Sequence, residues 1–224
     1  MKKPNQNSGV LFDLDGTLID TAEDMASILL DMIQKYDGDQ HISMTTARNY
    51  VSDGSIGLIK LGFPEVSEGK VLELQKIYLS QYQKKLCIHS KFFHSLKSLT
   101  RQLEKNDIKW GIVTNKPTRM TLPLLLELNQ YIQHVISGDT ITKRKPDPDP
   151  LILACNMMNI TPSNSIYVGD AKRDIDAGNL AGMKTIAVNY GYIKKGDDTA
   201  KWKATLIVDT PNQLSAVIKR ELRL

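Results

Sequence analysis

Polar residues that could carry chemistry follow the apolar runs of this sequence in four places. In chain order these sets are Asp13-Leu14-Asp15-Gly16-Thr17, Thr114-Asn115, Lys145-Pro146, and Gly169-Asp170 with Asp174. A short apolar run that stops at a polar turn is typical of a buried strand. Because parallel strands end at one edge of a sheet, the four sets can meet there although they lie far apart in sequence.

The acids of these sets indicate a divalent cation. Asp13, Asp15, Asp170 and Asp174 would repel one another strongly at one site unless a hard cation neutralised them. An oxygen-only site of this size, left partly hydrated, suits Mg²⁺. Beside such a cation Asp13 can stay ionised close to a phosphate and attack its phosphorus as a covalent nucleophile.

The remaining residues fit the other roles in phosphoryl transfer. Asp15 lies where Gly16 allows the chain to turn, and its carboxyl can protonate the departing oxygen and then deprotonate the hydrolytic water. Thr114 and Asn115 supply donors to the phosphoryl oxygens, and Lys145 adds a positive charge. We therefore predict a Mg²⁺-dependent phosphatase that passes through an aspartyl-phosphate.

Each motif alone has a plainer interpretation. D-x-D-G is often a calcium loop or a solvated turn, although an EF-hand would need Gly at Leu18 and Glu at Asp24. Thr114-Asn115 alone more often marks a turn, Lys145-Pro146 a solvated connector, and Gly169-Asp170 an ordinary helix start. The occurrence of all four sets, in order and at strand ends, favours the catalytic interpretation.

Strands that could position these residues alternate with helical patterns in the second part of the chain. Helical patterns at Leu151–Met158 and Ile175–Ala181 separate some of the apolar runs. This alternation predicts an α/β fold with a doubly wound, Rossmann-like parallel sheet. After Val10–Phe12, the predicted strands are Lys109–Val113, His134–Ile136, Ser165–Val168, Lys184–Val188 and Leu206–Val208.

The segment after the first motif reads as an all-helical insert. A helix is expected to start at Thr21, with Asp24 completing an approximate capping box. Its apolar stripe is Met25, Ile28, Leu29, Met32 and Ile33. The pattern stays helical from about residue 43 to 86. We expect a core domain of residues 1–19 and 88–224 and a helical cap domain of residues 20–87.

Composition places the chain among ordinary globular proteins, with 224 residues, 41% hydrophobic and 24% charged. A net charge of +4 from scattered Lys and Arg favours a small anionic partner over nucleic acid. The two cysteines lack metal-ligand spacing and fit a reducing cytosol. No signal peptide or membrane span is indicated. We expect a cytoplasmic monomer or weak homodimer.

The four sets, in this order, resemble those of the haloacid dehalogenase superfamily, and the resemblance covers essentially the whole chain. The helical insert is similar to that superfamily's C1 cap, a small lid over the active site. An acid at Asp15 is typical of its phosphatase and mutase branch. The resemblance implies that Asp13, the backbone carbonyl of Asp15, and Asp170 hold Mg²⁺, with Asp174 supporting them from behind.

Other segments resemble narrower groups. Those similar to phosphoglycolate phosphatases are Lys145–Leu151, Val168–Asp170 and Asn189–Tyr192. Those more similar to N-acetylmuramic acid 6-phosphate phosphatases are Trp110–Pro117, Pro150–Cys155 and Gly191–Ile193. Cys87–Ser90 lacks the proline common at this hinge in phosphoglycolate phosphatases, which favours the sugar-phosphate group. The resemblance thus implies a small carboxylated phosphate ester as the substrate.

The insert is expected to supply specificity. Arg48 could pair with a substrate carboxylate, while Gly54 permits close backbone approach beside Ser55. Arg48 is equally well explained as a surface residue, and His89 as a structural hinge residue. Two other functions remain open: a β-phosphoglucomutase-like sugar phosphomutase, and a non-enzymatic interaction module.

Overall fold

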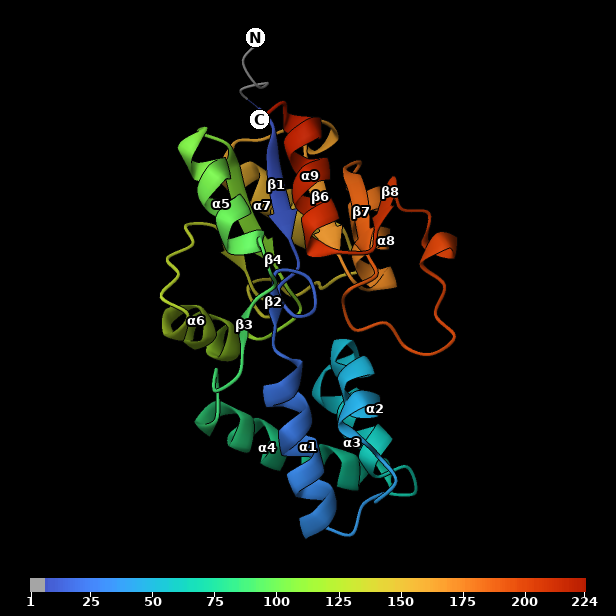
Figure 1. Cartoon of the computed structure of the whole chain (residues 1–224). Coiled ribbons are helices and arrows are strands. Elements are labelled where there is room, and N and C mark those ends of the chain that lie inside the picture. The colour runs from blue at the N-terminus through green and yellow to red at the C-terminus, as the bar shows by residue number, and fades with distance from the viewer. Residues whose placement is uncertain (1–6) are drawn as a thin grey trace.

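The computed structural model describes residues 7–224 and has an α/β core with a helical insertion beside it (Figure 1). The core holds a six-stranded sheet in the order β5-β4-β1-β6-β7-β8, and every neighbouring pair is parallel. Its strands are β1 (Gly9–Phe12), β4 (Lys109–Val113), β5 (Val135–Ile136), β6 (Ile166–Gly169), β7 (Lys184–Val188) and β8 (Leu206–Val208). The predicted parallel sheet is confirmed.

Helices cover both faces of this sheet. On one face lie α5 (Leu96–Lys105) and α9 (Pro211–Leu222), and on the other lie α7 (Asp149–Met158) and α8 (Lys172–Leu180). The helix α6 (Thr118–Glu127) follows β4, and short 3₁₀ turns occur at Pro162–Asn164 and Thr199–Trp202. The central strands are buried on both faces, which explains why they read as continuous apolar runs.

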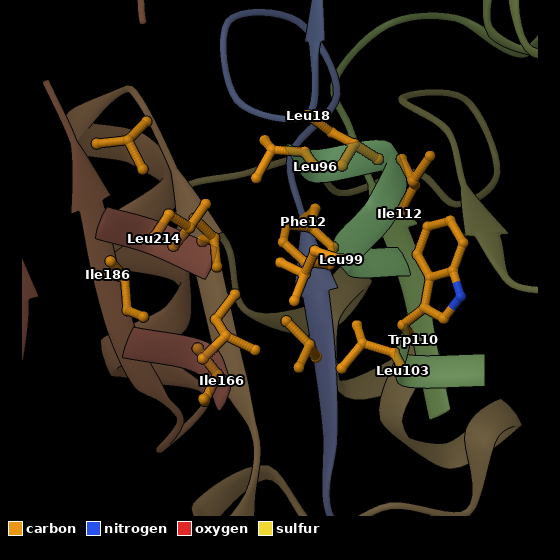
Figure 2. Close-up of a cluster of buried hydrophobic side chains, with 14 of the residues drawn as sticks. Phe12, Leu18, Leu96, Leu99, Leu103, Trp110, Ile112, Ile166, Ile186 and Leu214 are labelled. Carbon is orange, nitrogen blue, oxygen red and sulfur yellow. The ribbon is translucent and has the colours of Figure 1, made fainter. Parts of the chain in front are cut away.

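The larger core cluster joins the sheet to α5 and α9 (Figure 2). Phe12 of β1 packs edge-on against Trp110 of β4, with ring centroids 6.2 Å apart. Leu99 and Leu103 of α5 and Leu214 of α9 are fully buried over these strands. This packing fixes the strand ends that carry the polar motifs.

The insertion is all-helical and has an apolar cluster of its own. It consists of α1 (Ala22–Lys35), α2 (Met44–Asn49), a 3₁₀ turn at Val51–Asp53, α3 (Gly54–Gly62) and α4 (Glu68–Lys84). The stripe predicted for the first helix, Met25 to Ile33, is buried in this cluster. Ser43 and Ser67 cap α2 and α4 by accepting hydrogen bonds from backbone N–H groups.

Two connections join the insertion to the core, and they pair with each other. The strands β2 (Ile19–Asp20) and β3 (Lys91–Phe92) form an antiparallel pair that the sequence analysis did not predict. Asp24 of α1 is 2% exposed. Its carboxylate accepts hydrogen bonds from the backbone N–H groups of His89 and Ser90, at 2.8 and 2.9 Å, and from the Ser90 hydroxyl.

The capping box expected at Thr21 and Asp24 was wrong. Thr21 does precede α1, but its hydroxyl donates to Asp15 instead of serving the helix. Asp24 is occupied by the second connection, so tertiary contacts outweigh the local motif. Within residues 7–224, no helix combines the length and apolar character needed to cross a membrane.

We predict that Asp24→Asn lowers the free energy of unfolding by about 2 kcal/mol, because an amide cannot accept all three hydrogen bonds and leaves buried donors without partners. Asp31→Asn is the matched control on the same helix. Asp31 is exposed and forms only a surface ion pair with Lys85, so a change of at most about 0.5 kcal/mol is expected. Urea denaturation measures both values; equal effects would contradict the role assigned to Asp24.

Candidate active site

The predicted strand-end residues meet at the carboxyl edge of the sheet. β1 lies between β4 and β6, with Phe12 level with Ile112 on one side and Val168 on the other. The residues one or two positions beyond this level on the three strands therefore emerge side by side. This places Asp13, Thr114 and Asp170 around one point, as the sequence analysis predicted.

Lys145 is the cation at this point, and its side chain is almost fully buried. Its Nζ lies 2.8 Å from Asp13 Oδ1 and 2.7 Å from Asp174 Oδ1. It also donates to the carbonyl of Val113 at 2.8 Å and contacts the Tyr167 hydroxyl at 2.7 Å. Burial opposes the charged ammonium, but Asp13 and Asp174 together raise the pKa of Lys145 above its ordinary value.

Three carboxylates supply the negative charge next to the Lys145 ammonium. Asp13, Asp170 and Asp174 are buried, and each offers an oxygen atom within 4.8 Å of the others. The pKa of Asp170 is raised to about 7. Burial is the main cause, and the charges of Asp13 and Asp174 contribute to the same rise. Burial likewise raises the pKa of Asp13 to about 6, against the lowering effect of Lys145.

This cluster fits a metal cation. Among residues 7–224, Asp170 Oδ1 is a buried oxygen for which no hydrogen-bond partner is found. Its other oxygen, Oδ2, accepts from the Tyr192 N–H at 2.8 Å and from the Ser52 hydroxyl at 2.9 Å. A buried, unpartnered carboxylate oxygen beside two other carboxylates is costly unless a cation binds it.

Gly16 makes room for this arrangement. Its φ of +80° is a conformation that residues with a Cβ rarely adopt. A Cβ at this position would also lie 2.1 Å from Asp170 Oδ2. The glycine of the first motif therefore brings the Asp13–Thr17 turn against Asp170, beyond the turning role predicted for it.

Asp15 lies next to the cluster and faces the insertion. Its Oδ1 accepts from the Thr21 hydroxyl at 2.6 Å and from Lys116 Nζ at 3.0 Å. Lys116 also donates to the Tyr82 hydroxyl of α4 at 2.8 Å. The predicted proton donor is thus held by a second buried lysine, which the sequence analysis left without a role.

The two residues after β4 act differently from one another. Thr114 Oγ1 accepts from the backbone N–H of Lys116 at 3.1 Å. The side-chain amide of Asn115 binds the backbone of Lys145. It donates to the Lys145 carbonyl at 2.9 Å and accepts from the Lys145 backbone N–H at 3.1 Å. The structure therefore places Asn115 as a clamp on the Lys145 backbone, while both residues line the cavity described next.

A cavity of about 330 Å³ lies between the insertion and the core. Asp13, Asp15 and Lys145 form its floor, and Gly54 and Ser55 line its cap side. Other lining residues from the insertion are Met25, Val51, Ser52, Asp53, Ile56, Gln75, Tyr78, Leu79 and Tyr82, and the core adds the cations Lys116, Arg144 and Arg173.

The insertion also reaches the core through polar contacts of the turn at Val51–Asp53. The loop after α2 binds Asp170 through the Ser52 hydroxyl, while Arg173 donates to the Ser52 carbonyl. Beside it, Asp53 forms an ion pair with Lys194 at 3.0 Å. The insertion is therefore seated over the carboxylate cluster.

Arg48 and His89 lie outside this cavity lining. Arg48 pairs with Asp20 of β2 at 2.9 Å and stacks over the Tyr192 ring at 5.2 Å from its centroid. It therefore connects α2 to the first connection. His89 lies on the second connection, where its Nδ1 is 3.5 Å from Glu23 Oε1. Both positions agree with the structural alternatives that the sequence analysis left open.

Sequence reasoning missed Lys116, Arg173, Ser52 and Tyr82. Lys116 directly follows Thr114-Asn115, and Arg173 lies between Asp170 and Asp174. Their positions beside the motif residues could therefore have identified them as site residues. Ser52 fell within the cap loop that was expected to supply specificity. Nothing local marked Tyr82, which belongs to the apolar stripe of α4.

Comparison with known proteins agrees with this geometry. Residues 10–188 match the family described as "Haloacid dehalogenase-like hydrolase". The N-acetylmuramic acid 6-phosphate phosphatase of Pseudomonas putida is 38% identical, over 95% of this chain and 96% of that protein. The phosphoglycolate phosphatase of Xanthomonas campestris pv. campestris is 35% identical, over 92% of this chain and 93% of that protein.

Solved structures show the same fold. A predicted phosphoglycolate phosphatase from Haemophilus somnus superposes with a TM-score of 0.83 at 23% identity, covering 96% of this chain and 98% of that one. β-Phosphoglucomutase from Clostridium difficile superposes with a TM-score of 0.70 at 21% identity, covering 96% of each chain. At these identities the likeness concerns the fold alone.

The carboxylate cluster predicts how the metal-free protein responds to pH. The pKa of the Asp170 carboxyl group rises from 3.8 in the unfolded chain to about 7 in the folded protein. The protonated group therefore contributes stability that is fully present below the unfolded pKa. That contribution is lost as pH rises through the folded value. With EDTA present, we therefore expect Tm to fall between about pH 4 and about pH 7 and to level off above that range.

Two variants test the source of this pH dependence. Asp170→Asn should reduce it, with Asp13 as the remaining carboxyl group of raised pKa, and should raise Tm at the higher pH because a buried charge is removed. Asp176→Asn, on the nearby helix α8 and paired at the surface with Lys172, should leave it unchanged. Differential scanning calorimetry measures the values; a wild-type Tm that is flat across this range would contradict the assignment.

Proposed function

The chain belongs to the haloacid dehalogenase-like hydrolase family and is a phosphatase of that family, and we propose that it hydrolyses a small carboxylated phosphate ester through an aspartyl-phosphate on Asp13. The observation that carries this proposal is the placement of Asp13. It lies at the end of β1, on the floor of a cavity, with Lys145 on one of its oxygens and two further buried carboxylates beside it.

The first step transfers the phosphoryl group to the enzyme. A carboxylate oxygen of Asp13 forms a bond to phosphorus while the bond between phosphorus and the ester oxygen breaks. Asp15 gives its proton to that ester oxygen, which leaves as an alcohol. Lys145 holds Asp13 in place and offsets negative charge next to the phosphoryl group.

The second step releases phosphate. Asp15, now a carboxylate, takes a proton from water as the water oxygen attacks phosphorus, and the bond between phosphorus and Asp13 breaks. Asp15 is thereby protonated again and Asp13 is free. Thr114 and the backbone around Asn115 are placed to donate to the phosphoryl oxygens, since both residues line the cavity beside Asp13.

Mg²⁺ is the cation that we propose for the cluster. Asp13 and Asp170 would hold it together with the backbone carbonyl of Asp15, and Asp174 would orient Lys145 behind them. An oxygen-only donor set suits this ion. When bound, Mg²⁺ would supply positive charge to the phosphoryl oxygens.

The cavity favours the larger of two candidate esters. Its volume of about 330 Å³ is large for phosphoglycolate and lies in the range of sites that bind drug-sized ligands. Apolar and aromatic side chains of the insertion, including Tyr78 and Leu79, line its upper part. Together with the 38% identical relative, this supports N-acetylmuramic acid 6-phosphate as the preferred substrate, with 2-phosphoglycolate as the second.

We predict that Asp13→Asn lowers phosphate release from these esters at least about a thousandfold, because the amide is not a nucleophile. Asp31→Asn, a surface carboxylate on α1, is the control and should retain wild-type activity. Equal release by wild type and Asp13→Asn would remove the proposed mechanism. Isomerisation that depends on a bisphosphate, with little free phosphate, would instead indicate a phosphomutase.

A second prediction concerns substrate size. Ile56 lines the cavity and is 42% exposed, so Ile56→Trp should fill space without disturbing a core. We expect it to lower kcat/KM for N-acetylmuramic acid 6-phosphate at least about tenfold and to spare phosphoglycolate. Ile88→Trp, at an exposed position outside the cavity lining, is the control. Equal losses on both esters would contradict the size argument.

A further inference from the structure

Lys116 is the buried cation that the mechanism above does not use. Its side chain is 6% exposed, and its Nζ lies 3.0 Å from Asp15 Oδ1. The ammonium also donates to Tyr82 Oη at 2.8 Å and to Met25 Sδ at 3.9 Å. An ammonium has three hydrogens, so these three acceptors occupy all of its donors and fix its position.

Two of these three acceptors belong to the insertion. Met25 lies on α1 and Tyr82 on α4, and both are buried. The Tyr82 ring also faces the ammonium, 4.6 Å from its centroid. Lys116 itself follows β4 in the core. The ammonium therefore links the seating of the insertion to a carboxyl group on the floor of the cavity.

Both donors to Asp15 bind the same oxygen. Thr21 Oγ1 and Lys116 Nζ converge on Oδ1, at 2.6 and 3.0 Å. In a protonated carboxyl group the oxygen that accepts two hydrogen bonds is the carbonyl oxygen, so the proton resides on Oδ2. Holding Oδ1 in this way sets the plane of the carboxyl group and the direction in which its proton points.

We propose that Lys116 is a positioning residue for Asp15, held in place by Tyr82 and Met25 of the insertion. This inference rests on the proposed function of Asp15 as proton donor. In phosphoryl transfer the proton passes from Asp15 Oδ2 to the ester oxygen as the phosphorus–oxygen bond breaks. The carboxylate that remains is then next to the Lys116 ammonium, 3.0 Å from its Oδ1.

Leaving-group dependence tests this role, because kcat/KM covers only the steps up to the first irreversible phosphoryl transfer. An alkyl phosphate ester, such as a sugar 6-phosphate, needs its leaving oxygen protonated, whereas p-nitrophenolate leaves without a proton. We expect Lys116→Met to lower kcat/KM about a hundredfold for the alkyl ester and less than about fivefold for p-nitrophenyl phosphate. Lys116→Arg should recover part of the loss.

Tyr82→Phe removes one acceptor of the ammonium while keeping the ring, and should show the same selectivity with a smaller loss, about three- to tenfold for the alkyl ester. It keeps the test decisive if Lys116→Met does not fold. In an Asp15→Asn background, Lys116→Met should cause no further loss, because its effect passes through Asp15. Lys84→Met, an exposed lysine on the same helix as Tyr82, is the control.

Equal losses on both esters for Lys116→Met and Tyr82→Phe would overturn the inference and assign Lys116 to phosphate binding or to stability. Additive losses in the Asp15→Asn background would overturn it as well. These results differ from a failure of the proposed function, in which the wild-type enzyme would release no phosphate from either ester.

Discussion

The buried contact of the Lys145 ammonium with Asp13 and Asp174 is the interaction on which the site depends. A parallel sheet brings the ends of neighbouring strands together, and here those ends and the turn after them carry carboxylates. Buried carboxylates without compensating charge would be costly. Lys145 supplies that charge, and Asn115 fixes the Lys145 backbone through two hydrogen bonds, so the loop and the strand ends are mutually dependent.

The seating of the insertion on the core is a consequence of the same charges. The apolar cluster of the insertion is largely its own, with Met120 and Tyr192 as the buried core residues that join it. The other contacts near the site are polar: Ser52 on Asp170 and Tyr82 on Lys116. Polar contacts exchange with water at lower net cost than buried apolar surface. Polar side chains therefore form much of the contact between the insertion and the core beside the site.

The sequence predicted the elements whose patterns are local. Each strand of the sheet is an apolar run that ends in a polar turn, so its position, and the meeting of Asp13 with Asp170, could be predicted. The β2–β3 pair could not, because neither Ile19–Asp20 nor Lys91–Phe92 is an apolar run. The capping box failed because Asp24 has partners 65 and 66 residues away. Lys116 was visible in its motif, but its contact with Tyr82 is purely tertiary.

The charge balance of the cluster supports the proposal that it binds a cation and then an anion. The three carboxylates of Asp13, Asp170 and Asp174 face two nearby cations, Lys145 and Arg173, so one negative charge remains when all are ionised. A protonated Asp170 removes that excess in the metal-free protein, which agrees with its raised pKa. A divalent cation held by the three carboxylates would reverse that sign and leave one positive charge to attract a phosphate dianion.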